Sequence, residues 1–271
     1  MTSNDRANAP DPGRPAVAEA PEVVWFLHAD GVPLTRISGQ IAALDVLDKP
    51  RAYFDHDAVM FEQAKRLGVG TFSAYVDALA ASLDAAEQNP EIAGQRSMVA
   101  KKPLSLLVPM ADLGWLRNEP AIGRLLARRC RFVHVTYRDP ALQAIVGLLS
   151  KSGSAIDCIG SETPSFKAIA DNVASLADRE AAAAAWLGGR GHQVAELMIE
   201  ELAAPGVAAL RHLLNDLGLA LPPTARVNAI DSPNPGDLAL ARHFREAAGK
   251  RHWEHAIPLR APHWVFRVRA G

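Results

Sequence analysis

The sequence predicts an α/β protein, a three-layer sandwich in which a mostly parallel sheet is covered by helices on both faces. Short continuous apolar runs such as Val23–Leu27 are typical of strands buried on both sides. Segments with apolar residues three or four apart separate these runs, and strands alternating with helices are joined as parallel neighbours. With 271 residues, the chain is long enough for one large domain of this class.

The first half of the chain contains two predicted strands with helices between them. Val23–Leu27 ends at the breaker cluster His28–Pro33, and helical spacing follows over Thr35–Leu47. Asp55–Asn89 is predicted to be a helical insertion: one helix closes at Gly68, and a second, running to Leu83, starts from an N-cap at Thr71. A second strand is expected over Leu104–Val108 and a short helix over Glu119–Arg129.

The second half repeats the alternation. Arg131–Tyr137 is rich in β-branched and aromatic residues and is a predicted strand, followed by a helix that begins around Pro140 and runs to about Leu149. The further expected elements are an alanine-rich helix over Phe166–Gly188, a strand over Val194–Ile199 and a helix over Glu200–Leu217 ended by Gly218. Trp186 is expected in the core.

Composition excludes several classes of function. The 29 Lys and Arg against 30 Asp and Glu give a net charge of −1, which argues against a dedicated nucleic-acid binder. Cys130 and Cys158 are too few for a disulfide framework or a four-thiolate zinc site. No apolar run approaches the ~20 residues of a membrane span. The segment 1–21 lacks the pattern of a signal peptide and is expected to be a disordered tail, so a cytoplasmic location is expected.

The predicted α/β domain covers 22–248, and a basic extension covers 249–271. That extension carries five basic residues and one acid, and His263–Val268 reads as a strand. It is interpreted as a solvated edge strand, with an anion- or partner-binding surface as the alternative. His252, His255 and His263 lack the carboxylate or thiolate that would complete a zinc set, so no metal is expected.

Two strand-to-helix junctions are candidate anion sites. Ligands of parallel α/β sheets bind at the carboxyl ends of strands, where helix N-termini present free N–H groups. The candidates are His28–Thr35 after the first strand and Arg138–Asp139 after the strand that ends at Tyr137. Two such sites, one with a guanidinium, indicate a ligand with separated phosphate groups. The first junction is not a Walker A loop, because it lacks the spaced glycines and the Lys-Ser/Thr pair.

In order along the chain, these landmarks resemble the bacterial carbohydrate sulfotransferases of the trehalose 2-sulfotransferase type, over roughly Val23 to Arg245. That family has a P-loop-like α/β fold and uses 3′-phosphoadenosine 5′-phosphosulfate (PAPS) as donor. Lys49–Phe54 resembles its Gly-x-Pro-x-Glu-Tyr-Phe segment, and anchoring there places Thr35 at the last threonine of its Pro-Arg-Ser/Thr-Gly-Ser-Thr phosphosulfate loop. Val135–Asp139 resembles its 3′-phosphate element, with Arg138 as the phosphate-binding arginine. Ile199–Leu202 is similar to its Tyr-Glu-Asp-Leu segment.

The departures from the family pattern fall on the chemistry. Gly31, Pro33 and Leu34 replace the arginine, glycine and serine of the loop, and Val146 replaces the serine of the 3′-phosphate element. Ala52 stands where the family has the glutamate that resembles its base.

Histidine titrates near neutrality, so His28 and His56 are the candidate replacement bases. Each has the alternative interpretation of a capping or surface histidine. Arg36 and Arg51 are candidates for the lost cation of the loop.

The resemblance implies a sulfuryl transfer from PAPS to a hydroxyl of a carbohydrate or glycolipid, with Thr35 and Arg138 holding donor phosphates, and a homodimer. One alternative is a catalytically degenerate relative that binds a ligand or a partner. Another is an unrelated α/β domain, since fold analogy does not establish activity.

Overall fold

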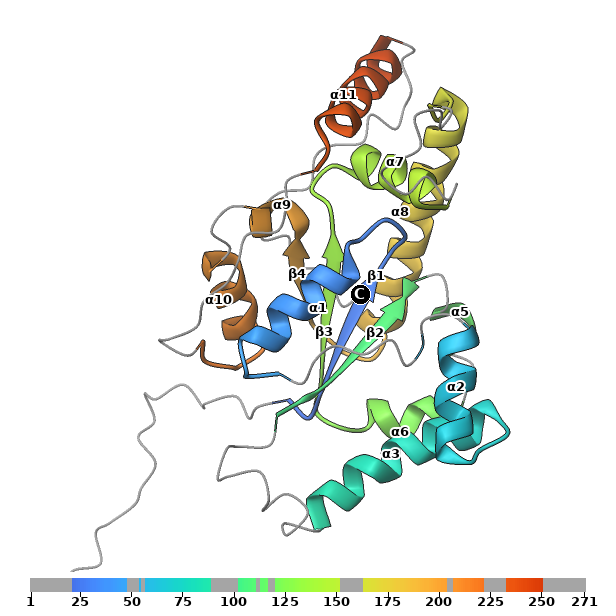
Figure 1. Cartoon of the computed structure of the whole chain (residues 1–271), viewed down its shortest axis with the longest axis vertical. Helices are drawn as coiled ribbons and strands as arrows, with labels where there is room; N and C mark the ends of the chain where they lie inside the picture. The colour runs from blue at the N-terminus through green and yellow to red at the C-terminus, as the bar shows by residue number, and fades with distance from the viewer. Residues whose placement is uncertain are drawn as a thin grey trace, which may run out of the picture.

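The computed structural model describes residues 21–47, 54, 57–88, 102–110, 113–116, 120–151, 163–203, 207–221 and 233–250. Its centre is a parallel sheet in the order β2-β1-β3-β4 (Figure 1). The strands are β1 (Val23–His28), β2 (Leu104–Pro109), β3 (Cys130–Thr136) and β4 (Val194–Met198). Each was predicted to within two residues at either end. The predicted α/β fold class with a parallel sheet is confirmed.

Most of the predicted helices are present. Between β1 and β3 lie α1 (Leu34–Ala43), α2 (Asp57–Leu67), α3 (Phe72–Gln88), α5 (Leu113–Leu116) and α6 (Ile122–Leu126). After β3 come α7 (Pro140–Lys151), α8 (Phe166–Gly188), α9 (Ile199–Ala203), α10 (Val207–Asp216) and α11 (Pro235–Lys250). The insertion predicted around Asp55–Asn89 is confirmed as α2 and α3.

Local signals explain several of these boundaries. The Thr71 hydroxyl accepts a hydrogen bond from the N–H of Ala74 (3.2 Å) and so caps α3 as predicted. Ser165 caps α8 in the same way through Ala168 (3.2 Å). Gly68 ends α2 at φ +69°, a conformation that glycine adopts without a Cβ penalty.

One predicted helix is two separate helices in the structure. Glu200–Leu217 was expected to be continuous, but the structure has α9 ending at Ala203 and α10 beginning at Val207. The sequence between them contains Pro205, which lacks the N–H that a helix interior requires. The helix predicted over Glu119–Arg129 is reduced to α6, and α5 and α11 were not anticipated.

Alternating side chains of β1 build two cores, one on each face of the sheet. Val24 and Phe26 pack with α1, α7 and α10 on one face. Val23, Trp25 and Leu27 pack with α3, α6 and the second half of α8 on the other, where the Trp25 ring lies 5.9 Å from both Phe54 and Phe132. Figure 1 shows α1 and α8 on opposite sides of the strands. Trp186 is buried in the second core, as predicted.

The order of the strands reverses next to β1. The chain moves from β1 to β2 on one side and then to β3 on the other side of β1. In open parallel sheets, ligands bind outside the carboxyl ends of the strands where the order reverses in this way. That edge carries the loops that follow β1 and β3.

The segments 1–20 and 251–271, with the predicted strand His263–Val268, lie outside the described residues. So do Arg51, Ala52 and His56.

Candidate functional site at the carboxyl edge of the sheet

The two predicted anion sites lie next to each other. β1 and β3 are hydrogen-bonded neighbours, with His28 opposite Val135, so both loops leave the sheet at the same edge. The Tyr137 hydroxyl donates to the carbonyl oxygen of Gly31 (3.4 Å) and connects the two loops directly. The structure therefore brings the helix start that carries Thr35 beside the junction that carries Arg138.

The loop after β1 is held tightly against α7. Gly31 has φ +85°, and a Cβ built on it would lie 2.6 Å from the backbone nitrogen of Gly147. A residue with a side chain would meet both backbone strain and a clash here. Gly31 is thus required by the local packing.

The first turn of α1 offers a ligand few hydrogen-bond donors. Pro33 is its N-cap and makes no side-chain cap hydrogen bond, and no acid lies in the first turn. The N–H of Leu34 is used locally, in a bond to the Val32 carbonyl (2.8 Å). Thr35 is exposed in the first turn, so its hydroxyl is accessible to a ligand at the positive end of the helix dipole.

The junction after β3 is ordered by acidic side chains. The N–H of Arg138 donates to both carboxylate oxygens of Glu200 (2.8 and 2.9 Å), and Nη2 of Arg138 lies 3.3 Å from Oε1 of Glu201. Asp139 accepts from the N–H of Ala141 (3.0 Å) at the start of α7 and pairs with Arg245 of α11 (3.1 Å). The predicted phosphate-binding arginine is therefore in contact with a carboxylate of the chain itself.

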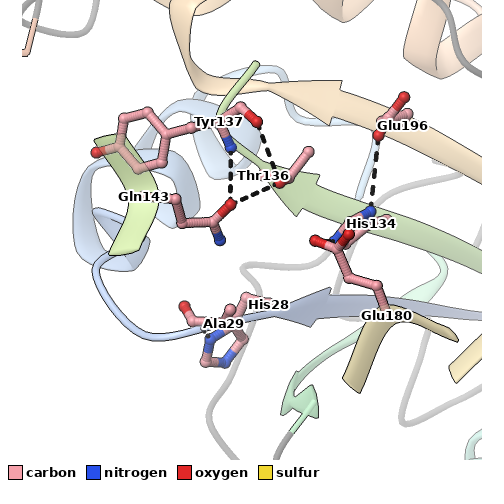
Figure 2. A network of polar contacts seen from close by, with 8 residues as sticks. All are labelled: His28, Ala29, His134, Thr136, Tyr137, Gln143, Glu180 and Glu196. Atoms are coloured by element: carbon pink, nitrogen blue, oxygen red, sulfur yellow. Dashed lines mark hydrogen bonds and ion pairs between the residues drawn. The ribbon is translucent and has the colours of Figure 1, made fainter. Parts of the chain in front are cut away.

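Gln143 fixes the path of the chain out of β3. Its Oε1 accepts hydrogen bonds from the Thr136 hydroxyl (2.8 Å) and from the Tyr137 N–H (3.3 Å), as Figure 2 shows. The side chain is 1% exposed, so these bonds form away from competing water. Gln143 thereby sets the direction in which Arg138 leaves the sheet.

Burial and charge shift two titrations at this edge. Burial raises the pKa of Tyr137 to about 12, with a further rise from the Glu200 and Asp237 carboxylates and a smaller opposite effect of Arg36. Burial also raises the pKa of Glu200, against the stabilising hydrogen bond from the Arg138 backbone. Tyr137 is a neutral hydrogen-bond donor at physiological pH.

His28 lies at the end of β1, but its ring is buried. It is 5% exposed, and its Nδ1 is 3.4 Å from the Ala29 carbonyl oxygen. Its role as a base stays a prediction.

A second polar cluster lies inside the sheet. His134 of β3 has Nε2 3.5 Å from Glu180 of α8 and Nδ1 3.7 Å from Glu196 of β4 (Figure 2). The three side chains are 3%, 14% and 3% exposed. We call these three residues the buried cluster. A small pocket lined by His134, Glu180, Leu27 and Met110 adjoins it.

The sequence did not predict the buried cluster or the contacts of Glu200 and Glu201 with Arg138. The two adjacent acids were interpreted as a helix start, which they are, but their contacts with Arg138 bridge more than sixty residues. A histidine and a glutamate inside predicted strands were the available signal for the buried cluster.

In the described parts of the chain, no group of three His, Cys, Asp or Glu residues has an arrangement that could hold a metal ion. No described helix is long and apolar enough to cross a membrane.

No family model matches the chain, and no curated protein matches it. Among solved structures, the sulfotransferase domain from the curacin biosynthetic pathway is similar with a TM-score of 0.39 and 14% identity, over 75% of this chain and 76% of that one. The sulfotransferase domain from the Synechococcus PCC 7002 olefin synthase is similar with a TM-score of 0.34 and 16% identity, over 82% of this chain and 86% of that one. The parallel sheet itself establishes the α/β fold class.

Proposed function

We propose that this protein is sulfotransferase-like and binds PAPS at the carboxyl edge of β1, β3 and β4, for transfer of its sulfuryl group to a carbohydrate or glycolipid hydroxyl. The observation that carries the proposal is the meeting of two strand-to-helix junctions, with Thr35 on one and Arg138 on the other, joined by the Tyr137–Gly31 hydrogen bond. A ligand with two separated phosphate groups matches two such junctions. The motif resemblance assigns the same two residues to those phosphates.

Each junction suits a different part of the donor. The uncapped start of α1, with the exposed Thr35 hydroxyl, suits the 5′-phosphosulfate, because a helix N-terminus stabilises negative charge. Arg138 suits the 3′-phosphate, since a guanidinium can donate two parallel hydrogen bonds to it. Tyr137 and Gln143 hold the backbone between these groups without taking part in binding.

The transfer requires a base and stabilisation of the leaving phosphate. The acceptor oxygen forms a bond to sulfur while the bond from sulfur to the bridging phosphate oxygen breaks, and 3′-phosphoadenosine 5′-phosphate leaves. The acceptor proton passes to a histidine, for which His28 and His56 are the proposed candidates. A positioned base of this kind contributes about 10²–10⁴-fold to the rate.

A second candidate function is a binding module without catalysis. It is favoured by the loop after β1, where Pro33 supplies no N–H and the N–H of Leu34 is used by Val32. Fewer donors then remain to stabilise a leaving phosphate. Binding of the nucleotide is common to both candidates, and only the transfer step separates them.

Calorimetric titration with PAPS and with 3′-phosphoadenosine 5′-phosphate tests the binding step. We expect saturable binding of both nucleotides, weakened by about 1.5–3 kcal/mol in Arg138→Ala, the range for a hydrogen bond to a charged group. Arg124→Ala is the matched control, because Arg124 is also ion-paired (3.0 Å to Asp77) but precedes β3 at the opposite edge of the sheet. Absence of heat and of a thermal shift at millimolar nucleotide contradicts the proposal.

Transfer of labelled sulfate from PAPS to a panel of sugars and glycolipids then distinguishes the two candidates. Labelled product that is lost in His28→Ala or His56→Ala supports the enzyme. Nucleotide binding without any labelled product supports the binding module.

A further inference from the structure

Two adjacent acids at the start of α9 act on the same arginine in different ways. The Glu200 carboxylate accepts the Arg138 backbone N–H at 2.8 and 2.9 Å, and its side chain is largely buried. Among the described residues, Glu201 contacts the Arg138 side chain, at 3.3 Å between Nη2 and Oε1. Glu200 therefore orders the backbone of the junction, whereas Glu201 contacts the Arg138 guanidinium, which is the group that would bind a ligand.

The pair between Arg138 and Glu201 is weak by its geometry. Strong guanidinium–carboxylate pairs are bidentate, with two short parallel hydrogen bonds. Here Nε of Arg138 is buried and has no hydrogen-bond partner among the described residues. The two side chains are 37% and 20% exposed, so water competes with the single contact. A phosphate group with three oxygens satisfies this guanidinium better than Glu201 does.

We propose that Glu201 is an internal competitor of the nucleotide 3′-phosphate: it holds the Arg138 guanidinium in the free protein and must release it when a phosphomonoester binds. This inference rests on the proposed function. Glu201 then lowers the affinity of this edge of the sheet for 3′-phosphorylated nucleosides, because its negative charge also repels the phosphate dianion. The opposite role, in which Glu201 orients Arg138 for the ligand, predicts a change of the opposite sign.

The test compares Glu201→Gln with the unchanged protein by calorimetry, using two nucleotides that differ by one phosphate. Removing the negative charge that lies 3.3 Å from Nη2 of Arg138 is expected to raise the affinity for 3′-phosphoadenosine 5′-phosphate about fivefold. For adenosine 5′-phosphate, which lacks the 3′-phosphate, we expect less than a twofold change. In an Arg138→Ala background the gain from Glu201→Gln is expected to disappear.

Glu22→Gln is the matched control for net charge. Glu22 also pairs with arginines, at 3.2 Å from Arg128 and 3.0 Å from Arg129, but it precedes β1 at the opposite edge of the sheet. It should leave both affinities unchanged. The unfolding midpoint of each variant in urea verifies that the fold is retained.

Each of the following results overturns the inference. A lower affinity in Glu201→Gln means that Glu201 positions Arg138. Equal gains for both nucleotides, or a gain that persists without Arg138, mean that the effect does not pass through the 3′-phosphate. If neither the unchanged protein nor Glu201→Gln binds either nucleotide, the proposed function fails together with the inference; binding without a gain overturns the inference alone.

Discussion

Two regions of the sheet carry charged side chains, and they differ in the distances between the charged groups and in their exposure to water. At the carboxyl edge, Arg138 contacts Glu201 at 3.3 Å through side chains that are 37% and 20% exposed. In the buried cluster, His134 lies 3.5 Å from Glu180 and 3.7 Å from Glu196, and the three side chains are 3%, 14% and 3% exposed. Water therefore competes more strongly for the Arg138–Glu201 contact than for the contacts of His134, so the edge is suited to ligand exchange and the cluster to holding elements together.

The largest effect is expected from breaking the buried cluster. His134→Leu leaves the Glu180 and Glu196 carboxylates buried near each other without the intervening imidazole. The expected loss in the free energy of unfolding is about 3–5 kcal/mol, the cost of leaving a buried charge uncompensated. Urea unfolding at neutral pH measures it.

A combined variant separates charge from packing in this region. With His134, Glu180 and Glu196 all replaced by leucine, most of the loss should be recovered, because no charge remains to be buried. A combined variant as unstable as His134→Leu alone would show that packing, and not charge, controls this part of the sheet.

A smaller effect is expected at the edge, from Gly31→Ala. The new Cβ would be only 2.6 Å from the Gly147 nitrogen in a backbone of φ +85°, so we expect a loss of about 3 kcal/mol in urea unfolding. Gly191→Ala is the matched control, since Gly191 has φ +71° but open space around its Cβ position. It should lose only the conformational part, about 1 kcal/mol. Equal losses in the two variants would contradict the close packing of the β1 loop on α7.

The smallest effect is a loss of stability at alkaline pH that is due to the ionisation of Tyr137. Its pKa is about 12 in the folded protein against 10 for the free side chain, so its contribution to stability is complete below pH 10 and is lost as the pH rises towards 12. The full contribution is at most about 2.7 kcal/mol at 1.36 kcal/mol for each pKa unit. The stability difference between the unchanged protein and Tyr137→Phe should therefore shrink over this pH range. A difference that is constant with pH would mean that the hydroxyl is not buried between the two loops.

Local sequence patterns predicted the elements that local physics determines. The continuous apolar run of β1 and the alanine-rich α8 behind its Ser165 cap needed no knowledge of distant contacts. The single helix predicted over Glu200–Leu217 was wrong, since the structure has α9 and α10 there. The apolar periodicity of the sequence continues across Pro205, but a proline removes a hydrogen bond from a helix interior, and this cost outweighs the periodicity.

The chemistry of the site depends on contacts that no local pattern contains. Arg138 and Thr35 could be chosen from their positions after strands, since parallel strands bring such loops to one edge. The contact of Glu201 with Arg138 arises only when β4 pairs with β3 and α9 turns over the edge. The buried cluster likewise combines β3, β4 and α8, and its members are adjacent only through the register of the sheet.

Hydrogen–deuterium exchange with and without saturating 3′-phosphoadenosine 5′-phosphate tests the location of the site most directly. We expect slower exchange in peptides that cover 29–36 and 137–141, with unchanged exchange in the strand interiors around the buried cluster. Protection confined to another part of the molecule, or no protection at a nucleotide concentration that saturates binding, would contradict the assignment of the site to this edge of the sheet.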